Sequence, residues 1–128
     1  MANTQAMCTS FKGELLVGHH NFGTGVVRGS TAADSFKAAL YLASATVNAS
    51  TTAYSATNEV SGTGYTAGGV AVTFGTAPST SGTTAFVTPS ASITYTTVTL
   101  ATAFDAVLIY NSTQSNKAVS VHTFGSQT

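Results

Sequence analysis

Residues 107–110 read Val-Leu-Ile-Tyr and are apolar at all four positions. Successive side chains of a β-strand point to opposite faces of a sheet, so this stretch presents apolar side chains on both faces. Such a strand belongs at the centre of a sheet, where both of its faces are covered. We therefore expect a central strand at residues 106–110, covered by a second sheet or by another subunit.

Outward from this strand, the sequence repeats short apolar alternations separated by turn residues. Residues 35–43 place Phe36, Leu40 and Leu42 on one face of a strand and Tyr41 on the other. Clusters of Gly, Pro, Ser and Thr interrupt the alternation, as is typical of antiparallel proteins. The pattern predicts strands over residues 35–43, 70–75, 84–88, 92–100, 106–110 and 118–124, with a turn at 78–82.

The predicted strand at residues 92–100 contains a phase shift. Its apolar positions change parity between Tyr95 and Val98. An extra residue in one strand of a pair produces such a shift. We therefore expect a β-bulge near Thr96 and Thr97.

The N-terminal part of the chain has a different pattern. Residues 1–9 are small and polar without a period, which is typical of an arm that becomes ordered only on a partner. Phe11 and Leu15 follow at a spacing of four, which predicts one or two helical turns within residues 10–17. Glycines and small polar residues then predict a loop over residues 19–33.

These elements indicate an all-β protein with the size of one domain. We expect a single antiparallel β-sandwich, jelly-roll-like, of about six to eight strands. It occupies residues 32–128 and includes a long ordered loop or hairpin at residues 54–69. Residues 1–31 form an extended N-terminal arm with a short helical turn and a loop.

Charged residues are unusually scarce. Asp, Glu, Lys and Arg make up 6% of the chain, whereas they make up about 25% of an average soluble domain. The net charge is zero, so copies of the chain do not repel one another, and a net charge near zero promotes association. We therefore expect the surface to be protected by an assembly partner.

The basic residues argue against nucleic-acid binding, because they are too few and too scattered to follow a phosphate backbone. They are Lys12, Arg28, Lys37 and Lys117. No apolar run reaches the roughly 18 residues of a membrane span. Residues 1–10 lack the charged and apolar regions of a signal peptide. We therefore expect no nucleic-acid or membrane partner, and synthesis in the cytoplasm.

The residues that could carry chemistry do not form a coherent site. His19 and His20 are adjacent, but too few other ligands exist to complete a metal site, so a solvated loop pair is favoured. Cys8 lies in the expected arm, where catalytic geometry is not pre-organised. Residues 62–69 overlap a dinucleotide fingerprint, but a predicted strand follows them in place of the required helix. We therefore expect no catalytic residue, cofactor or metal.

Five segments carry a family resemblance when they are taken in order. They are Ser35-Phe-Lys-Ala-Ala-Leu-Tyr41, Thr52-Ala-Tyr54, Thr57-Asn-Glu-Val60, Ser61-Gly-Thr-Gly-Tyr-Thr-Ala-Gly-Gly69 and Ala106-Val-Leu-Ile-Tyr-Asn111. Together they resemble a family of small virion proteins of tailed bacteriophages. The resemblance implies a structural part of the virion without catalytic residues. It also implies a glycine-rich loop whose backbone is fixed by Asn58 and Glu59.

The leading functional expectation is a capsid decoration or cement protein. It would bind the outside of the major capsid protein shell as a homotrimer and stabilise that shell. One alternative is a structural protein of the neck or tail, as a connector or a tube-associated ring. The other is a host-binding module in which exposed Tyr54, Tyr65 or Tyr95 stacks on a glycan. The candidate interface and structural residues are Phe11, Leu15, Phe36, Leu40, Tyr41, Tyr54, Asn58, Glu59, Gly62, Gly64, Tyr65, Gly68, Gly69, Leu108 and Tyr110.

Overall fold

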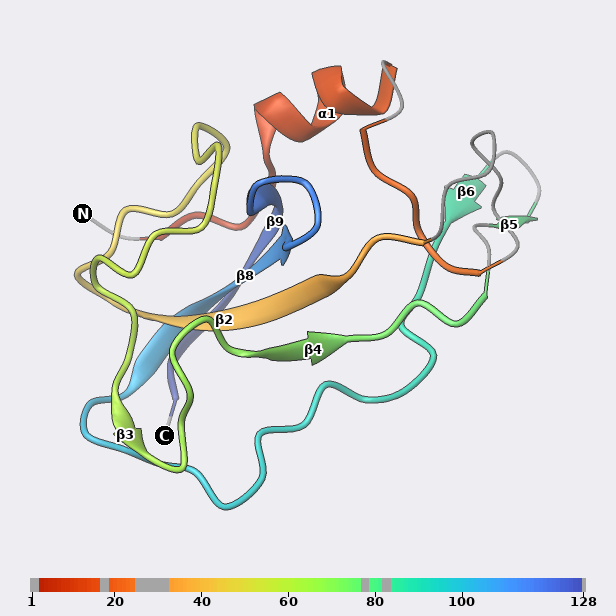
Figure 1. The fold of residues 1–128 in the computed structure, drawn as a ribbon. Helices are drawn as coiled ribbons and strands as arrows, with labels where there is room; N and C mark the ends of the chain where they lie inside the picture. Colours follow the sequence, from red (N-terminus) through yellow and green to blue (C-terminus); the bar gives the residue numbers. More distant parts are fainter. Residues whose placement is uncertain (1–2, 17–18, 25–32, 77–78, 82–83, 128) are drawn as a thin grey trace.

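The computed structural model describes residues 3–16, 19–24, 33–76, 79–81 and 84–127. Figure 1 shows long antiparallel strands beside one short helix. The elements in chain order are β1 (Ala6–Met7), α1 (Thr9–Leu16), β2 (Phe36–Leu42), β3 (Gly62–Thr63), β4 (Val70–Val72), β5 (Ser79–Ser81), β6 (Thr84–Phe86), β7 (Thr99–Leu100), β8 (Phe104–Asn111) and β9 (Lys117–Gln127).

Five of the strands form one antiparallel sheet, in the order β1-β9-β8-β2-β4. The pairs β3–β7 and β5–β6 form separate two-stranded ribbons. The apolar strand β8 lies between β9 and β2, so the predicted central strand is confirmed. The predicted all-β, sandwich-like class is confirmed as well. Loops and short two-stranded ribbons form much of the layer that packs on the large sheet.

The pairing of β2 with β8 defines the two faces of the sheet. Leu108 is opposite Ala39, and Val107 is opposite Leu40. Directly opposed residues of an antiparallel pair share a face. We call the side that carries Ala39, Tyr41, Leu108 and Tyr110 the loop-covered face, and the side that carries Ala38, Leu40, Val107 and Ile109 the groove face.

The loop-covered face is closed by residues 43–60 of the same chain. Ala45 and Val47 join its core, and Tyr54 stacks on Tyr110 with ring centroids 4.7 Å apart. As a result Leu108 is 0% exposed and Tyr41 is 1% exposed. Apolar burial of this kind is the main stabilising contribution in a small domain.

The prediction that residues 1–9 become ordered only on a partner is wrong for the residues that the structure describes. Ala6 and Met7 pair with β9 as strand β1, and Cys8 is completely buried. Asn3 donates a hydrogen bond to Asp105 Oδ2 at 2.6 Å and another to the carbonyl of Leu42. A two-residue strand has no period, so the sequence pattern gave no sign of it.

The predicted helical turn is confirmed as α1, which places Phe11 in the core. Residues 25–32 of the predicted loop, and with them the boundary predicted between residues 31 and 32, lie outside the described residues. No helix in the described part of the chain is long and apolar enough to cross a membrane.

The predicted strand over residues 92–100 is wrong for most of its length. Only Thr99 and Leu100 form a strand there, and Thr97 has a positive φ of 52°. Tyr95 donates its hydroxyl to the carbonyl of Ala38 at 2.6 Å, which anchors this segment to β2 as a loop. The parity shift therefore reflects a turn at Thr97 and not a bulge in a paired strand.

The register irregularities of the large sheet occur elsewhere. They fall in the β2–β8 pair beside Leu42 and at two places in the β8–β9 pair. The turn predicted at residues 78–82 is also wrong in its centre, because residues 79–81 form β5. These short strands carry too few alternating positions to be read from sequence.

Candidate binding groove and the networks that frame it

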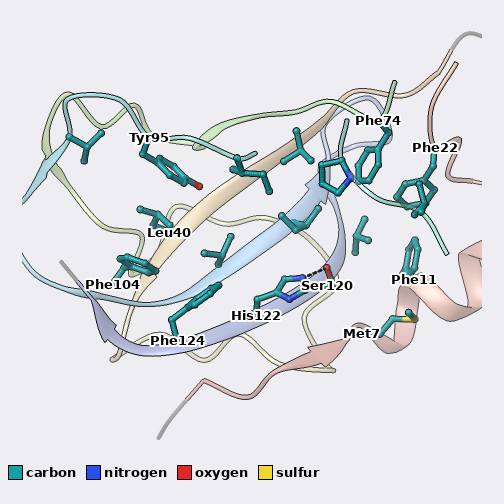
Figure 2. A pocket seen from close by; sticks show the side chains of 18 of the residues that line it. Met7, Phe11, Phe22, Leu40, Phe74, Tyr95, Phe104, Ser120, His122 and Phe124 are labelled. Carbon is teal, nitrogen blue, oxygen red and sulfur yellow. Dashed lines mark hydrogen bonds between the residues drawn. The ribbon is translucent and has the colours of Figure 1, made fainter. Parts of the chain in front are cut away.

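An apolar groove of about 840 Å³ runs along the groove face of the sheet (Figure 2). Its volume is within the range of ligand and peptide sites in proteins, roughly 300–1,000 Å³. The lining residues are mostly aliphatic or aromatic and come from both ends of the chain: Met7, Phe11, Phe22, Leu40, Val72, Phe74, Val87, Pro89, Ile93, Tyr95, Val98, Leu100, Phe104, Val107, Ile109, Val119, Ser120, His122 and Phe124.

The sheet forms the floor of the groove, and an irregular segment forms one wall. Residues 87–100 pass over the β2 and β4 side of the groove face, where Tyr95 is bonded to Ala38 and Ser90 N donates to Thr73 O. No strand of the described chain covers the β8 and β9 side. Phe124 is 55% exposed there, and Met7 is 49% exposed. The groove therefore opens along β9.

An aromatic cluster closes one end of the groove, as Figure 2 shows for Phe11, Phe22 and Phe74. Phe22 stacks on Phe36 with ring centroids 4.6 Å apart and meets Phe74 edge-on at 5.1 Å. Phe11 meets Phe22 edge-on at 5.9 Å. Edge-to-face and offset aromatic pairs add to the stabilisation that burial provides. The N-terminal segment is thus built into this end of the groove.

None of the charged side chains in the described part of the chain lines the groove. Ser120 Oγ and His122 Nε2 lie 3.0 Å apart and satisfy each other. Desolvation lowers the pKa of His122 below its ordinary value, so the ring is neutral at pH 7. An apolar occupant would therefore leave no charge buried without a partner.

The Ser120–His122 pair lacks the third group of a nucleophilic site. Activation of a serine requires a base that is itself held by an acid or a carbonyl. Within the described residues, no such group is hydrogen-bonded to His122 Nδ1. Ser120 and His122 therefore form a hydrogen-bonded polar pair within an otherwise apolar lining.

A second polar centre, on Glu59, fixes the glycine-rich loop. Its Oε1 accepts hydrogen bonds from the Tyr65 hydroxyl at 2.6 Å and from Gly68 N at 2.7 Å, and its Oε2 accepts one from the Tyr54 hydroxyl at 2.7 Å. Tyr110 donates to the carbonyl of Gly68 at 2.8 Å. Each bond to a carboxylate is stronger than a bond between neutral groups. Glu59 thus ties the loop to itself and, through Tyr110, to β8.

The tyrosines around Glu59 remain protonated well above the pH at which free tyrosine ionises. Burial and then the hydrogen bond to the Glu59 carboxylate raise the pKa of Tyr54 and Tyr65. Burial also raises the pKa of Tyr41 to about 12 and raises the pKa of Tyr95. Deprotonation of Tyr54 or Tyr65 would place two anions in contact.

Backbone geometry explains the glycines of this loop. A Cβ on Gly69 would lie 1.6 Å from the carbonyl oxygen of Ala38, and Gly69 also has a φ of +76°. A Cβ on Gly62 would lie 2.1 Å from the carbonyl oxygen of Thr99. Only glycine permits such a close approach of two backbones. Gly64, Gly68 and Asn58 also have positive φ.

A third network joins the N-terminal segment to the β8–β9 turn. His20 Nε2 lies 2.6 Å from Glu14 Oε2, and Lys117 Nζ donates to Glu14 Oε1 at 2.9 Å. Asn111 Nδ2 lies 3.0 Å from His20 Nδ1 and donates to Asp34 Oδ2 at 2.8 Å. Pairing of this kind is what makes buried polar groups tolerable.

The tautomer of His20 follows from this geometry. The Oδ1 of Asn111 accepts from the backbone N–H groups of Thr113 and Gln114, which fixes its Nδ2 toward His20. Because Nδ2 is a donor, His20 Nδ1 must accept, and His20 Nε2–H donates to Glu14. Burial by itself raises the pKa of Glu14, but the hydrogen bonds from Lys117 and His20 and the charge of Lys117 outweigh it and lower that pKa.

The prediction that His19 and His20 form a solvated pair is wrong for one of the two residues. His19 is exposed, whereas the side chain of His20 is 0% exposed. The network was missed because its members are spread from residue 14 to residue 117 without a motif. The adjacent histidines were the only sequence signal for any part of it.

The structure separates the candidate interface residues into distinct groups. Phe11 and Leu40 line the groove. Leu15 is 46% exposed on α1 and lies outside the lining. Phe36, Tyr41 and Leu108 belong to the core. Tyr54, Tyr65 and the backbone of Gly68 donate hydrogen bonds to Glu59, and Tyr110 donates one to the carbonyl of Gly68. The backbone of this loop is shaped by Asn58, Gly62, Gly64 and Gly69.

The host-binding alternative requires that Tyr54, Tyr65 or Tyr95 be exposed, and the structure does not meet this requirement. All three are half-buried, and each hydroxyl donates to a group of the same chain. The rings of Tyr65 and Tyr95 also stack on each other, with centroids 6.2 Å apart. They are therefore engaged in holding the loop.

Comparison with known proteins gave no match to a family model, to a curated protein or to a solved structure. The resemblance to phage virion proteins therefore stays a prediction from the sequence motifs.

Proposed function

We propose that this protein is a structural component of a tailed-phage virion, and that it works as a decoration or cement protein. It would bind the outer surface of the shell of major capsid proteins and stabilise that shell. The single observation that carries this proposal is the open, uncharged, apolar groove face. Large exposed apolar patches on a folded protein mark surfaces that other molecules cover.

The rest of the molecule suits a rigid adaptor. Glu59 and its tyrosines hold one side of the sheet, and the buried bonds of Glu14 and His20 hold the N-terminal segment. A rigid surface loses little conformational freedom when it binds. Many copies with individually weak contacts would then reinforce a shell through mass action and multivalency.

The direct test uses purified particles of the phage that encodes this chain. Gradient-purified virions are digested, and the protein is quantified by peptide mass spectrometry against the major capsid protein. The proposal expects hundreds of copies per particle. Six or twelve copies would instead indicate a ring at the neck or tail, and absence from the particles would refute a virion role.

A second test measures shell stability. Particles that lack the protein are expected to lose their genome at a lower temperature than particles that carry it, and adding the purified protein should restore the difference. Equal melting of the two kinds of particle would contradict a cement role while leaving a purely structural position open.

A further inference from the structure

We infer that the occupant of the groove is a second copy of this chain, which packs face to face over β8 and β9 and supplies the sheet layer that this side lacks. The inference deepens the proposed function by naming a partner. It is tested on the isolated protein, so its failure would leave the virion assignment standing.

The first step is the uneven covering of the central strand. Leu108 on one face of β8 is 0% exposed beneath residues 43–60, whereas Val107 on the other face is only partly buried and lines the groove. Phe104 lines it as well. Apolar residues on both faces of a strand are expected where both faces are packed. The described chain completes that packing on one face, whereas on the groove face it covers Ile109, which is 8% exposed, but leaves Val107 partly exposed.

The second step is charge. A partner that placed a charge against the lining would bury that charge without a counterion, because the lining has none. The groove face of another copy meets this requirement, since it is equally uncharged and already satisfies its Ser120–His122 pair. The net charge of zero adds no repulsion between copies.

The third step is size. Strand β8 has eight residues, so the open floor is about 26 Å long at roughly 3.3 Å per residue, and three strand spacings make it about 14 Å wide. That footprint is smaller than the roughly 800 Å² that each partner buries in a standard interface. The pair should therefore be weak, like other interfaces of less than standard size. Two sheets packed face to face about 10 Å apart would bury Phe124 and Met7 on both copies.

The experiment is sedimentation equilibrium of the purified chain from about 5 to 500 µM. The mass is expected to rise from 12.9 kDa toward twice that value. Because the contact contains no ion pair, raising NaCl from about 0.05 to 1 M should not weaken it. A mass that stays at one chain, or that plateaus at three chains, would overturn the inference.

A matched pair of variants tests the surface. Phe124→Asp changes a groove residue that is 55% exposed, and Phe86→Asp changes a residue of the same type that is 44% exposed and lies outside the lining. Phe124→Asp should raise the dissociation constant at least tenfold, whereas Phe86→Asp should leave it within about twofold. If Phe124→Asp fails to fold, Met7→Lys replaces it. Met7 lies at another place on the lining, and its substitution should raise the dissociation constant by a similar factor. Equal effects of the groove variants and Phe86→Asp would contradict the inference.

Discussion

The two faces of the large sheet consist of adjacent residues of the same strands, but they differ in how much of each face the chain covers. Over the loop-covered face the chain folds back, and Glu59 locks the returning loop with three hydrogen bonds. Over the groove face the chain passes as an irregular segment that leaves the β8 and β9 side open. Both covering segments are held by hydrogen bonds, but the loop tied to Glu59 covers its face, whereas residues 87–100 reach only the β2 and β4 side of the other face.

The largest expected effect comes from the point where the loop approaches the sheet. Gly69→Ala would push a methyl group into the Ala38 carbonyl, 1.6 Å away, at a φ of +76°. We expect it to lower the free energy of unfolding by at least about 4 kcal/mol. Gly125→Ala is the control, because its φ is +62° and no atom lies within 4 Å of the added Cβ. It should cost only about 1 kcal/mol. Urea unfolding measures both, and similar values would show that the close approach is not tight.

The next effect compares the two faces directly through neighbouring residues of β8. Leu108→Ala removes a completely buried side chain and should cost about 3 kcal/mol. Val107→Ala removes a partly buried side chain from the groove floor and should cost about 1 kcal/mol. The measurement is urea unfolding at a concentration of a few micromolar, where a weak pair of chains would be dissociated. Equal costs would mean that the groove face is packed as fully as the other face in solution.

A smaller effect tests the three hydrogen bonds that Glu59 accepts. Glu59→Gln keeps the shape of the side chain but turns one acceptor oxygen into a donor that faces a hydroxyl or a backbone N–H. We expect a loss of about 2 kcal/mol. Tyr54→Phe removes a single hydroxyl and should lose about 1 kcal/mol. A Glu59→Gln protein with the unfolding midpoint of the parent would show that the loop is held by apolar packing alone.

The smallest effect is a pH dependence from the N-terminal network. The folded pKa of Glu14 is lowered below its ordinary value of 4.5. Its contribution to stability is therefore present above about pH 4.5 and is lost as the pH falls through the folded pKa. Urea midpoints between pH 7 and pH 3 should decline less in Glu14→Gln than in the parent. Parallel declines would mean that Glu14 titrates alike in the folded and unfolded chains.

The sequence predicted the elements that rest on long periodic patterns. β2 and β8 have seven and eight residues; the alternation in β2 predicted its two faces, and the unbroken apolar run in β8 predicted the central strand. β1, β3 and β7 have two residues each, which is too short for a period. The segment at 92–100 has strand-like composition, but the turn at Thr97 and the Tyr95 bond to Ala38 prevented pairing, and both are tertiary effects.

The candidate site was less accessible to sequence reasoning. The motif set around Asn58 and Glu59 identified the fixed loop, because glycines at restricted backbone positions leave a local signature. The groove has no such signature, since it assembles residues from Met7 to Phe124 through the topology of the sheet. Residues 107–110 gave the one advance indication, namely that the second face of this strand needs a cover from a sheet or from another subunit.

The most direct test of this account is a map of the intact particle at side-chain resolution. We predict that Phe124 and Val107 lie beneath side chains of a neighbouring subunit, while residues 43–60 still cover the opposite face. A map in which the groove face is open to solvent, with the contacts made instead through the loop-covered face, would contradict the account.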